Sequence, residues 1–354
     1  MLKFFESQGR DYVKGRISTN TVGWMYGFVH FSVEVCCFYF LFSRLRYSAL
    51  WWVYGFLFDA LAFIPQCFLG LWVDRMEKEL LGIIGCLMLL LALFLPFDVP
   101  AFFLLTLGNA AVHISGAKHS LSHAGGKIGP CSTFVAGGSF GVITGQLLGG
   151  MEQSLLWIPC GCMVVALALC VVAFLLHKTD KEEACSFHVS SDKLSLGMIV
   201  LLAFLSAAIR SYVAYAIPTA WKKDTLHAIL LFSSMGIGKY MGGVLCDRIG
   251  YQKTASLSLL FSLPFLLFGN ELMTVSLIGV GLFSMTMPVT VAILASAFPK
   301  NPAFGFGITT VALFVGVAPV FFFRPEGLLV NQLIVLILGA AAAVSLKFSL
   351  KKRC

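Results

Sequence analysis

The sequence predicts an all-α membrane protein with about twelve transmembrane helices, arranged as two pseudo-symmetric six-helix bundles. Three observations lead to this prediction. Hydrophobic residues make up 58% of the 354 residues and charged residues only 12%, about half the charged fraction of an ordinary soluble domain. The apolar residues form continuous runs of the length that crosses a bilayer. One short charged segment also occurs twice, about half a chain apart, which indicates an internal duplication.

The apolar runs are continuous and do not alternate with polar residues, so they predict helices and exclude the spans of a β-barrel. Six runs precede and six follow the polar stretch 177–193. We therefore expect a first bundle over residues 1–177, a cytoplasmic linker over 178–193 and a second bundle over 194–354. The twelve expected spans are 21–42, 49–71, 80–95, 99–117, 131–150, 155–176, 194–216, 226–245, 254–268, 273–296, 304–323 and 328–348.

The positive charge predicts how the chain is oriented in its membrane. The net charge is +8, and most of the 25 Lys and Arg residues, Lys239 among them, fall on one side when both termini are placed in the cytoplasm. This asymmetry follows the positive-inside rule, so we attribute it to topology and expect no nucleic-acid partner. We expect a multi-pass protein of the plasma membrane, specifically a bacterial cytoplasmic membrane, with both termini cytoplasmic.

The duplicated segment is an Asp-Arg turn that ends an apolar run in each half. Its aspartates, Asp74 and Asp247, are 173 residues apart in the sequence. Glycine permits close helix packing, aspartate is stabilised at a helix N-terminus, and arginine pairs with carboxylates. The motif consists of Gly70, Asp74 and Arg75 in the first copy and of Gly243, Asp247, Arg248, Gly250 and Lys253 in the second. Its role as a gating loop is implied by the family resemblance described next.

The second copy resembles the cytoplasmic loop between helices 2 and 3 of the major facilitator superfamily, which reads roughly G-x-L-x-D-R-x-G-x-x-K. The first copy departs from that pattern at Trp72, Glu77 and Leu80. The resemblance implies a transporter of twelve helices in two bundles, which alternate the access of a central cavity. It also implies that the loops clasp neighbouring helices while the cavity faces outward.

Glycines recur every four residues in the fifth expected span. The pattern resembles the superfamily's antiporter signature G-x-x-x-G-P-x-x-G-G, with Gln146 in place of the proline. Glycines at this spacing form a flat ridge, which serves either as a sliding surface or as an ordinary tight helix contact. Its residues are Gly137, Gly141, Gly145, Gly149 and Gly150. The superfamily's helix-4 arginine is absent, and His113 is the nearest basic residue.

Ionisable residues inside a span are costly and indicate a functional site. Glu34, Asp59 and Arg210 are of this kind, and His30 lies one turn before Glu34 on the same helix face. We expect Glu34 or Asp59 to take up and release a proton, His30 to relay it and Arg210 to pair with the carboxylate. The alternative is structural, with Glu34 and Arg210 as a permanent latch between bundles and Asp59 in a polar contact between helices.

The resemblance implies that helices 1, 4, 7 and 10 line the cavity. The polar residues expected to contact the solute there, or on the glycine-rich helix, are Asn109, His113, Gln146, Thr286 and Tyr212. His119 and His123 have the spacing of a metal pair, but no third ligand is evident. We expect no metal and no cofactor, and the sequence contains no nucleotide-binding loop.

These observations predict a secondary active transporter that moves a small organic solute by alternating access. The glycine pattern weakly favours proton-coupled efflux by antiport. The alternative is a non-transporting membrane sensor or assembly protein that keeps the same fold. We expect no enzymatic activity. The expected partners are the solute, protons and the lipid bilayer, and the protein is expected to be a monomer because both bundles lie in one chain.

Overall fold

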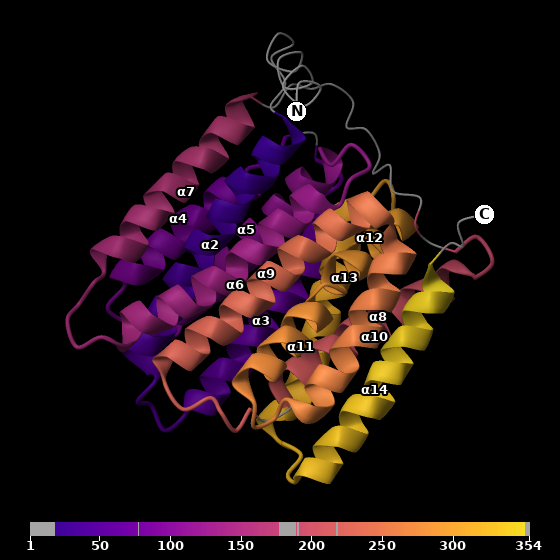
Figure 1. Cartoon of the computed structure of the whole chain (residues 1–354). Helices are drawn as coiled ribbons and strands as arrows, with labels where there is room; N and C mark the ends of the chain where they lie inside the picture. The colour runs from indigo at the N-terminus through magenta and orange to yellow at the C-terminus, as the bar shows by residue number, and fades with distance from the viewer. Residues whose placement is uncertain (1–17, 77, 177–188, 190, 217–218, 351–354) are drawn as a thin grey trace, which may run out of the picture.

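The computed structural model describes residues 18–76, 78–176, 189, 191–216 and 219–350 (Figure 1). Its regular secondary structure is helical. The helices of the first half are α2 (Thr19–Phe40), α3 (Trp51–Val73), α4 (Leu81–Phe94), α5 (Asp98–Ser122), α6 (Gly129–Gly150) and α7 (Trp157–Leu176). Those of the second half are α8 (Leu196–Ala216), α9 (Thr225–Ile249), α10 (Tyr251–Phe268), α11 (Met273–Ser284), α12 (Met287–Ala297), α13 (Pro302–Val317) and α14 (Leu328–Ser349).

The twelve expected spans all correspond to helices, which confirms the predicted fold class. Ten helical segments of the described chain are long and apolar enough to cross a membrane, and α4 is a shorter apolar helix. α2 continues into a π-helical turn, η1 (Leu41–Leu45), and α13 into a 3₁₀ turn, η2 (Ala318–Phe321). The expected linker 178–193 lies mostly outside the described residues, so the exact domain boundaries stay a prediction.

The tenth expected span is divided into α11 and α12. Pro288 lies in the first turn of α12 and has no N–H to donate to the preceding turn, which interrupts the helix there. Thr286 precedes the new helix, and its hydroxyl donates to the carbonyl of Phe283 at 2.7 Å. Thr286 is therefore buried in the break and does not line the cavity, which corrects its expected role as a solute contact.

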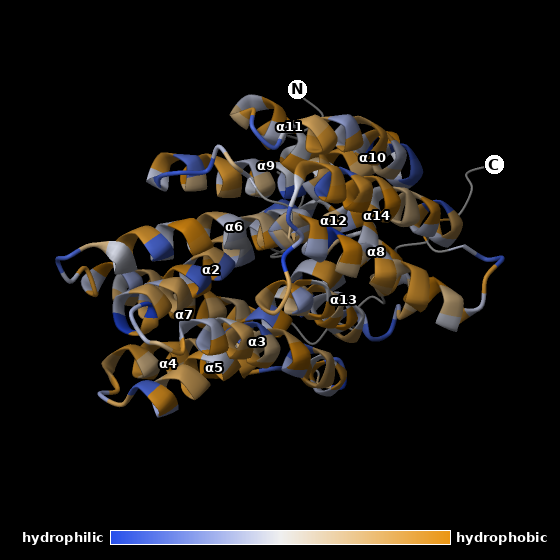
Figure 2. Ribbon diagram, turned by 90° about the horizontal axis from the view of Figure 1, so that it is seen from below, coloured by the Kyte–Doolittle hydropathy of each residue, from blue (hydrophilic) through white to orange (hydrophobic). Residues whose placement is uncertain are grey.

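The helices pack as two bundles with equivalent contacts between them (Figures 1 and 2). In the first bundle α2 packs along α6, and α4 packs against α5 and α7. In the second, α8 packs against α13 and α14, and α10 against α11 and α14. The bundles meet where α3 contacts α13 and where α6 contacts α9. The 173-residue offset converts α3 into α9 and α6 into α13, so the two contacts are symmetry-related.

The glycine ridge of α6 lies inside the first bundle, against α2. A Cβ at Gly145 would lie 2.6 Å from the carbonyl oxygen of Val35, and one at Gly149 would lie 2.6 Å from that of Tyr39. One turn before Gly145, Gly141 meets the carbonyl oxygen of Phe31, and two turns before it Gly137 meets that of Gly27; Gly150 faces Arg46. Of the two roles expected for the ridge, the geometry supports tight helix packing, and its role in antiport stays a prediction.

Candidate functional site

A cavity of about 610 Å³ lies between the bundles. At its inner end it is lined by His30 of α2 and His113 of α5, in the middle of their helices. At the other end it reaches Lys222 and Arg324, which are exposed in the segments after α8 and η2. The cavity therefore opens at the end of the molecule opposite the Asp-Arg turns.

The inner end of the cavity holds a buried acid–imidazole cluster, made of Glu34, His30 and His113. The Nε2 atoms of His30 and His113 are 2.7 Å apart. An Oε1 atom of Glu34 lies 3.3 Å from Nε2 of His113 and 3.7 Å from Nε2 of His30. It also accepts a hydrogen bond of 3.2 Å from Nδ2 of Asn109. The sequence predicted the pairing of His30 with Glu34 by helical spacing, whereas only the fold brings in His113 from α5.

The hydrogen bonds of the cluster indicate where its protons lie. Nδ1 of His30 contacts the carbonyl oxygen of Phe134 at 2.9 Å, and Nδ1 of His113 contacts that of Asn109 at 2.9 Å. A carbonyl oxygen only accepts, so each Nδ1 carries a hydrogen, and in a neutral ring Nε2 would then be bare. Two bare nitrogens at 2.7 Å repel each other. A hydrogen between the two Nε2 atoms would turn this contact into a hydrogen bond, and it would lie beside the Glu34 carboxylate.

The same three side chains are a group that is able to hold a metal ion, since their ligand atoms lie within 4.8 Å of one another. The sequence predicted no metal site, and this cluster had no spacing signal that would identify it as one. Two imidazole nitrogens on a tetrahedral zinc ion stand about 3.3 Å apart. The observed 2.7 Å is instead the length of a hydrogen bond.

Two cationic side chains enter the cavity from the second bundle. Arg210 of α8 donates to the hydroxyl of Thr290 at 3.1 Å, and Lys239 of α9 donates to the hydroxyl of Ser139 at 2.8 Å. Neither forms an ion pair with a carboxylate among the described residues. The expected pair between Glu34 and Arg210 is therefore wrong, because Glu34 is directed toward α5 of its own bundle.

Lys239 was expected on the cytoplasmic side, and the structure corrects this placement. It lies inside α9 and lines the cavity. A single lysine within the apolar run 226–245 was the signal for this position. Asp59 of α3 also lines the cavity and has no hydrogen bond or ion pair among the described residues. The expected structural role of Asp59, a polar contact between helices, is therefore absent.

The other expected cavity residues lie elsewhere. Asn109 is buried behind Glu34 and supports it. Gln146 and Tyr212 are half-buried and do not line the cavity, whereas Tyr215, one turn after Ser211, does. The four helices that the resemblance selected, 1, 4, 7 and 10, all contribute residues to the lining, but the rotation of each helix about its own axis decides which side chains face inward.

The opposite end of the molecule is closed by the two Asp-Arg turns. The carboxylate of Asp74, after α3, accepts from the backbone N–H groups of Ala303 and Phe304 at 3.1 and 2.9 Å. The carboxylate of Asp247, in α9, accepts from those of Ile128 and Gly129, both at 2.9 Å. Each aspartate thus binds the N-terminal end of a helix in the other bundle, where a negative charge is favoured. We call these two contacts the aspartate clasps.

The glycines of the turns permit this close approach. A Cβ at Gly70 would lie 2.7 Å from backbone atoms of Ala303, and Gly243 lies directly against Ser132. Gly250 joins α9 to α10 at a φ of 92°, which side-chain-bearing residues rarely adopt. Arg75, Arg248 and Lys253 form no ion pair among the described residues, so the gating expectation receives its support from the aspartates and glycines.

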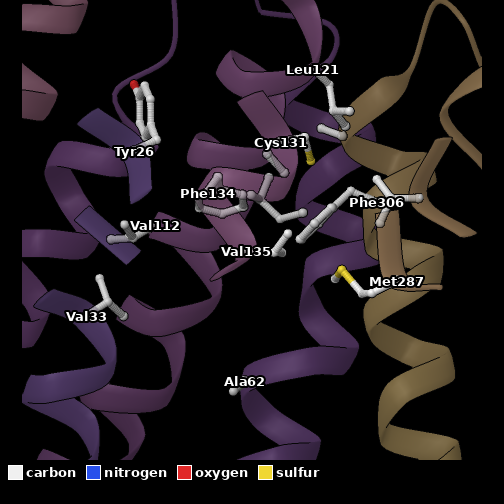
Figure 3. Close-up of a cluster of buried hydrophobic side chains, with 14 of the residues drawn as sticks. Tyr26, Val33, Ala62, Val112, Leu121, Cys131, Phe134, Val135, Met287 and Phe306 are labelled. Atoms are coloured by element: carbon white, nitrogen blue, oxygen red, sulfur yellow. The ribbon is translucent and has the colours of Figure 1, made fainter. Parts of the chain in front are cut away.

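An aromatic contact lies between the clasps and the acid–imidazole cluster. Phe134 of α6 and Phe306 of α13 meet across the bundle interface, with ring centroids 5.9 Å apart. Figure 3 shows Val135 and Met287 next to these rings. The ring of His30 packs on Phe134 at 4.8 Å. The cluster therefore rests on the layer that seals the cavity.

A comparison with solved structures identifies the architecture. The chain is similar to a variant of the Escherichia coli fucose:proton symporter FucP, with a TM-score of 0.60 over 94% of this chain and 99% of that chain. The chain has the major facilitator fold. Sequence identity to FucP is 13%, so the similarity shows the fold alone. No protein-family model and no curated protein sequence matches this chain.

Within the major facilitator fold, the observed arrangement is closed at the clasps and open at the end marked by Lys222 and Arg324. With the predicted orientation, the cavity faces outward. The two contacts between the bundles and the two clasps are related by the same pseudo-symmetry.

Proposed function

We propose that this protein is a secondary transporter that moves a small organic solute by alternating access, coupled to protons through Glu34, His30 and His113. The observation that carries the proposal is the 2.7 Å contact between the two Nε2 atoms beside Glu34. We infer that this contact holds a proton that exchanges with the cavity, next to the layer that seals the cavity. Buried ionisable groups at this depth are costly to keep without a function.

The coupling follows from the contacts of His30. When the additional proton leaves, the two Nε2 atoms repel and the His30 ring turns away from His113. That ring packs on Phe134 and is hydrogen-bonded to its carbonyl, so its movement disturbs the contact between Phe134 and Phe306. Loss of that contact weakens the seal, which favours opening at the clasped end. Proton occupancy thus biases the two-state equilibrium of the bundles.

The direction of coupling is a separate question. FucP is described as a symporter, whereas the glycine pattern of α6 favours antiport and efflux. Both modes use the same proton exchange at the cluster. Antiport and efflux stay our prediction, and the sign of the proton flux during solute movement decides between them.

The proposal is tested in proteoliposomes that contain a pH-sensitive dye, with gradients of sugars, organic acids and cationic drugs imposed in turn. The wild-type protein is expected to move protons with one solute class. Glu34→Gln is expected to abolish that proton flux while it retains solute exchange at equal concentrations. Glu152→Gln, at an exposed position, is the matched control and is expected to behave as wild type.

Each result bears on a different part of the proposal. Proton flux that persists in Glu34→Gln contradicts the role of the cluster. Solute movement without proton movement in the wild type contradicts coupling and leaves a uniporter. Solute binding without movement in any gradient supports the alternative of a non-transporting sensor or assembly protein.

A further inference from the structure

We propose that the cavity recognises its solute through a carboxylate group, with Arg210 and Lys239 as the counter-ions. The solute class is therefore organic anions with an apolar body. This inference rests on the proposed transport function, because it names what that cavity binds.

The first observation is an incomplete set of hydrogen bonds at Arg210. Its Nη1 donates to Thr290 at 3.1 Å, but Nη2 is buried without a hydrogen-bond partner. The side chain is 7% exposed and has no carboxylate partner among the described residues. A guanidinium presents its donors in a planar fork that matches a carboxylate. An unpaired buried cation is costly, and a bound anion removes that cost.

The second observation is Lys239, which lines the same cavity from the neighbouring helix α9. Among the described residues, its hydrogen-bond partner is the neutral hydroxyl of Ser139, at 2.8 Å. A hydroxyl satisfies one donor of the ammonium group but leaves its charge uncompensated. Two cations from one bundle thus face the cavity, and within the described part of the chain their hydrogen-bond partners are neutral oxygens.

The charge balance of the lining also favours an anion. Lys222 and Arg324 at the open end add two cations to Arg210 and Lys239. The acids of the lining are Glu34 and Asp59, and Glu34 already faces two imidazoles. Burial and the neighbouring Arg324 lower the pKa of Lys222, which indicates that positive charge is crowded at the opening. Such a funnel attracts anions over a long range.

The walls of the cavity favour an organic body on that anion. Phe38 and Phe58 line it from the first bundle, and Phe232 and Phe283 from the second. Pockets of a few hundred Å³ with apolar walls and few polar groups are typical of small-molecule sites. A bound carboxylate also explains how the cavity closes, because closure around unpaired Arg210 is unfavourable and closure around an ion pair is not.

The inference is tested by thermal unfolding of the purified full-length protein in detergent. The probes are benzoate, phenylacetate and hexanoate, each compared with its neutral amide and its primary amine analogue. A ligand that binds the folded state raises the melting temperature. We expect a rise of at least about 2 °C with a carboxylate and none with its amide or amine. Equal shifts with amides, larger shifts with amines, or no shift with any carboxylate would overturn the inference.

Two variants test the residues themselves. Arg210→Met and Lys239→Met are each expected to remove the carboxylate-dependent shift. Arg210→Met is also expected to melt at a higher temperature than wild type without ligand, because it removes an unpaired buried charge. A structural role for Arg210 predicts the reverse. Lys347→Gln, at an exposed position of α14, is the control and should keep the shift.

The failure of this inference and that of the proposed function are distinguishable. The binding assay has no gradient and no membrane, so it does not depend on proton coupling. Carboxylate binding without proton-linked flux contradicts the proposed function alone. Proton-linked flux of a neutral or cationic solute, with no carboxylate binding, contradicts this inference alone.

Discussion

Single side chains in this protein acquire their roles from partners far away in the sequence. Glu34 and His30 share a helix face by spacing, but His113 arrives 79 positions after Glu34, on α5. Arg210 and Lys239 are isolated cations in apolar runs, and their shared cavity is visible only once α8 and α9 are packed. The sequence analysis therefore identified Arg210 as a costly residue without identifying its neighbours, and it did not recognise Lys239 as one.

Glu79 is a second buried carboxylate, outside the membrane spans, and its hydrogen-bond partners are also brought to it by the fold. Glu79, between α3 and α4, accepts from the backbone N–H of Leu81 at 2.7 Å and from Nε2 of His119 at 3.1 Å. The hydroxyl of Ser115 also donates to it. Burial alone would raise the pKa of Glu79, but these hydrogen bonds outweigh it and lower the pKa below the usual 4.5.

We predict that Glu79 stabilises the protein in a pH-dependent way. Because its pKa is lower in the folded than in the unfolded state, its contribution is full above about pH 5 and is lost as the pH falls through the folded pKa. Glu79→Gln should therefore melt well below wild type at pH 7, and the gap should narrow toward pH 3. Thermal unfolding in detergent measures this.

The control for Glu79 is Glu152→Gln, which changes an exposed carboxylate. Its melting temperature should follow that of wild type at every pH. A gap between Glu79→Gln and wild type that stays constant from pH 7 to pH 3 would show that the carboxylate does not titrate differently in the two states.

At the scale of elements, the contact between α2 and α6 depends on an uninterrupted glycine ridge. The four glycines meet carbonyl oxygens of α2 at matching four-residue intervals, so the two backbones lie in direct contact. The sequence predicted the ridge from its spacing. It did not predict that the ridge faces α2 within one bundle. The glycine spacing is a property of one helix, whereas the helix that packs on it is decided by the tertiary fold.

We predict that Gly141→Ala destabilises the first bundle by about 1–3 kcal/mol, the usual cost of overpacking a tight contact. A Cβ there meets the carbonyl of Phe31 and lies 2.7 Å from Cβ of Glu34, so proton coupling should fall as well. Thermal unfolding and proteoliposome assays measure the two effects.

The matched control is Gly161→Ala in α7, where a Cβ meets nothing within 4 Å. In open space alanine favours a helix by up to about 1 kcal/mol over glycine, so this variant should be as stable as wild type or more stable. If Gly141→Ala behaves like Gly161→Ala, the close contact of α2 and α6 does not exist in the membrane.

At the scale of the whole molecule, the aspartate clasps hold the bundles together at one end. Each clasp joins the end of a helix in one bundle to the start of a helix in the other, and the two are related by pseudo-symmetry. The first Asp-Arg turn departs from the superfamily pattern at several positions, yet Asp74 makes the same contact as Asp247. The carboxylate and the nearby glycine are sufficient for the clasp.

We predict that Asp74→Ala and Asp247→Ala shift the protein toward a state that is open at the clasped end. Hydrogen bonds to a charged group contribute about 1.5–3 kcal/mol each, so each variant should change the opening equilibrium at least about 10-fold. Spin labels introduced at Lys127 and Lys300, which are exposed near that end, report the distance between the bundles. A longer-distance population should grow in each variant.

Asp98→Ala is the control for the clasps. Asp98 pairs with Arg44 at 2.7 Å within the first bundle, so its loss should leave the distance distribution unchanged. An unchanged distribution in both clasp variants would mean that the aromatic layer of Phe134 and Phe306 holds the closed end without them.

The sequence by itself determined the membrane-embedded helical fold, the helical nature of the twelve predicted segments, the duplication and, Lys239 excepted, the residues whose burial needs an explanation. These properties follow from hydropathy and residue spacing. Both are evaluated within a single segment and need no knowledge of which segments lie beside it. The tertiary structure decided that Glu34 meets His113 and not Arg210, that Lys239 faces the cavity, and that the glycine ridge packs on α2. Those outcomes depend on how each helix is rotated and which helix lies beside it, and both are set by packing between segments distant in the chain.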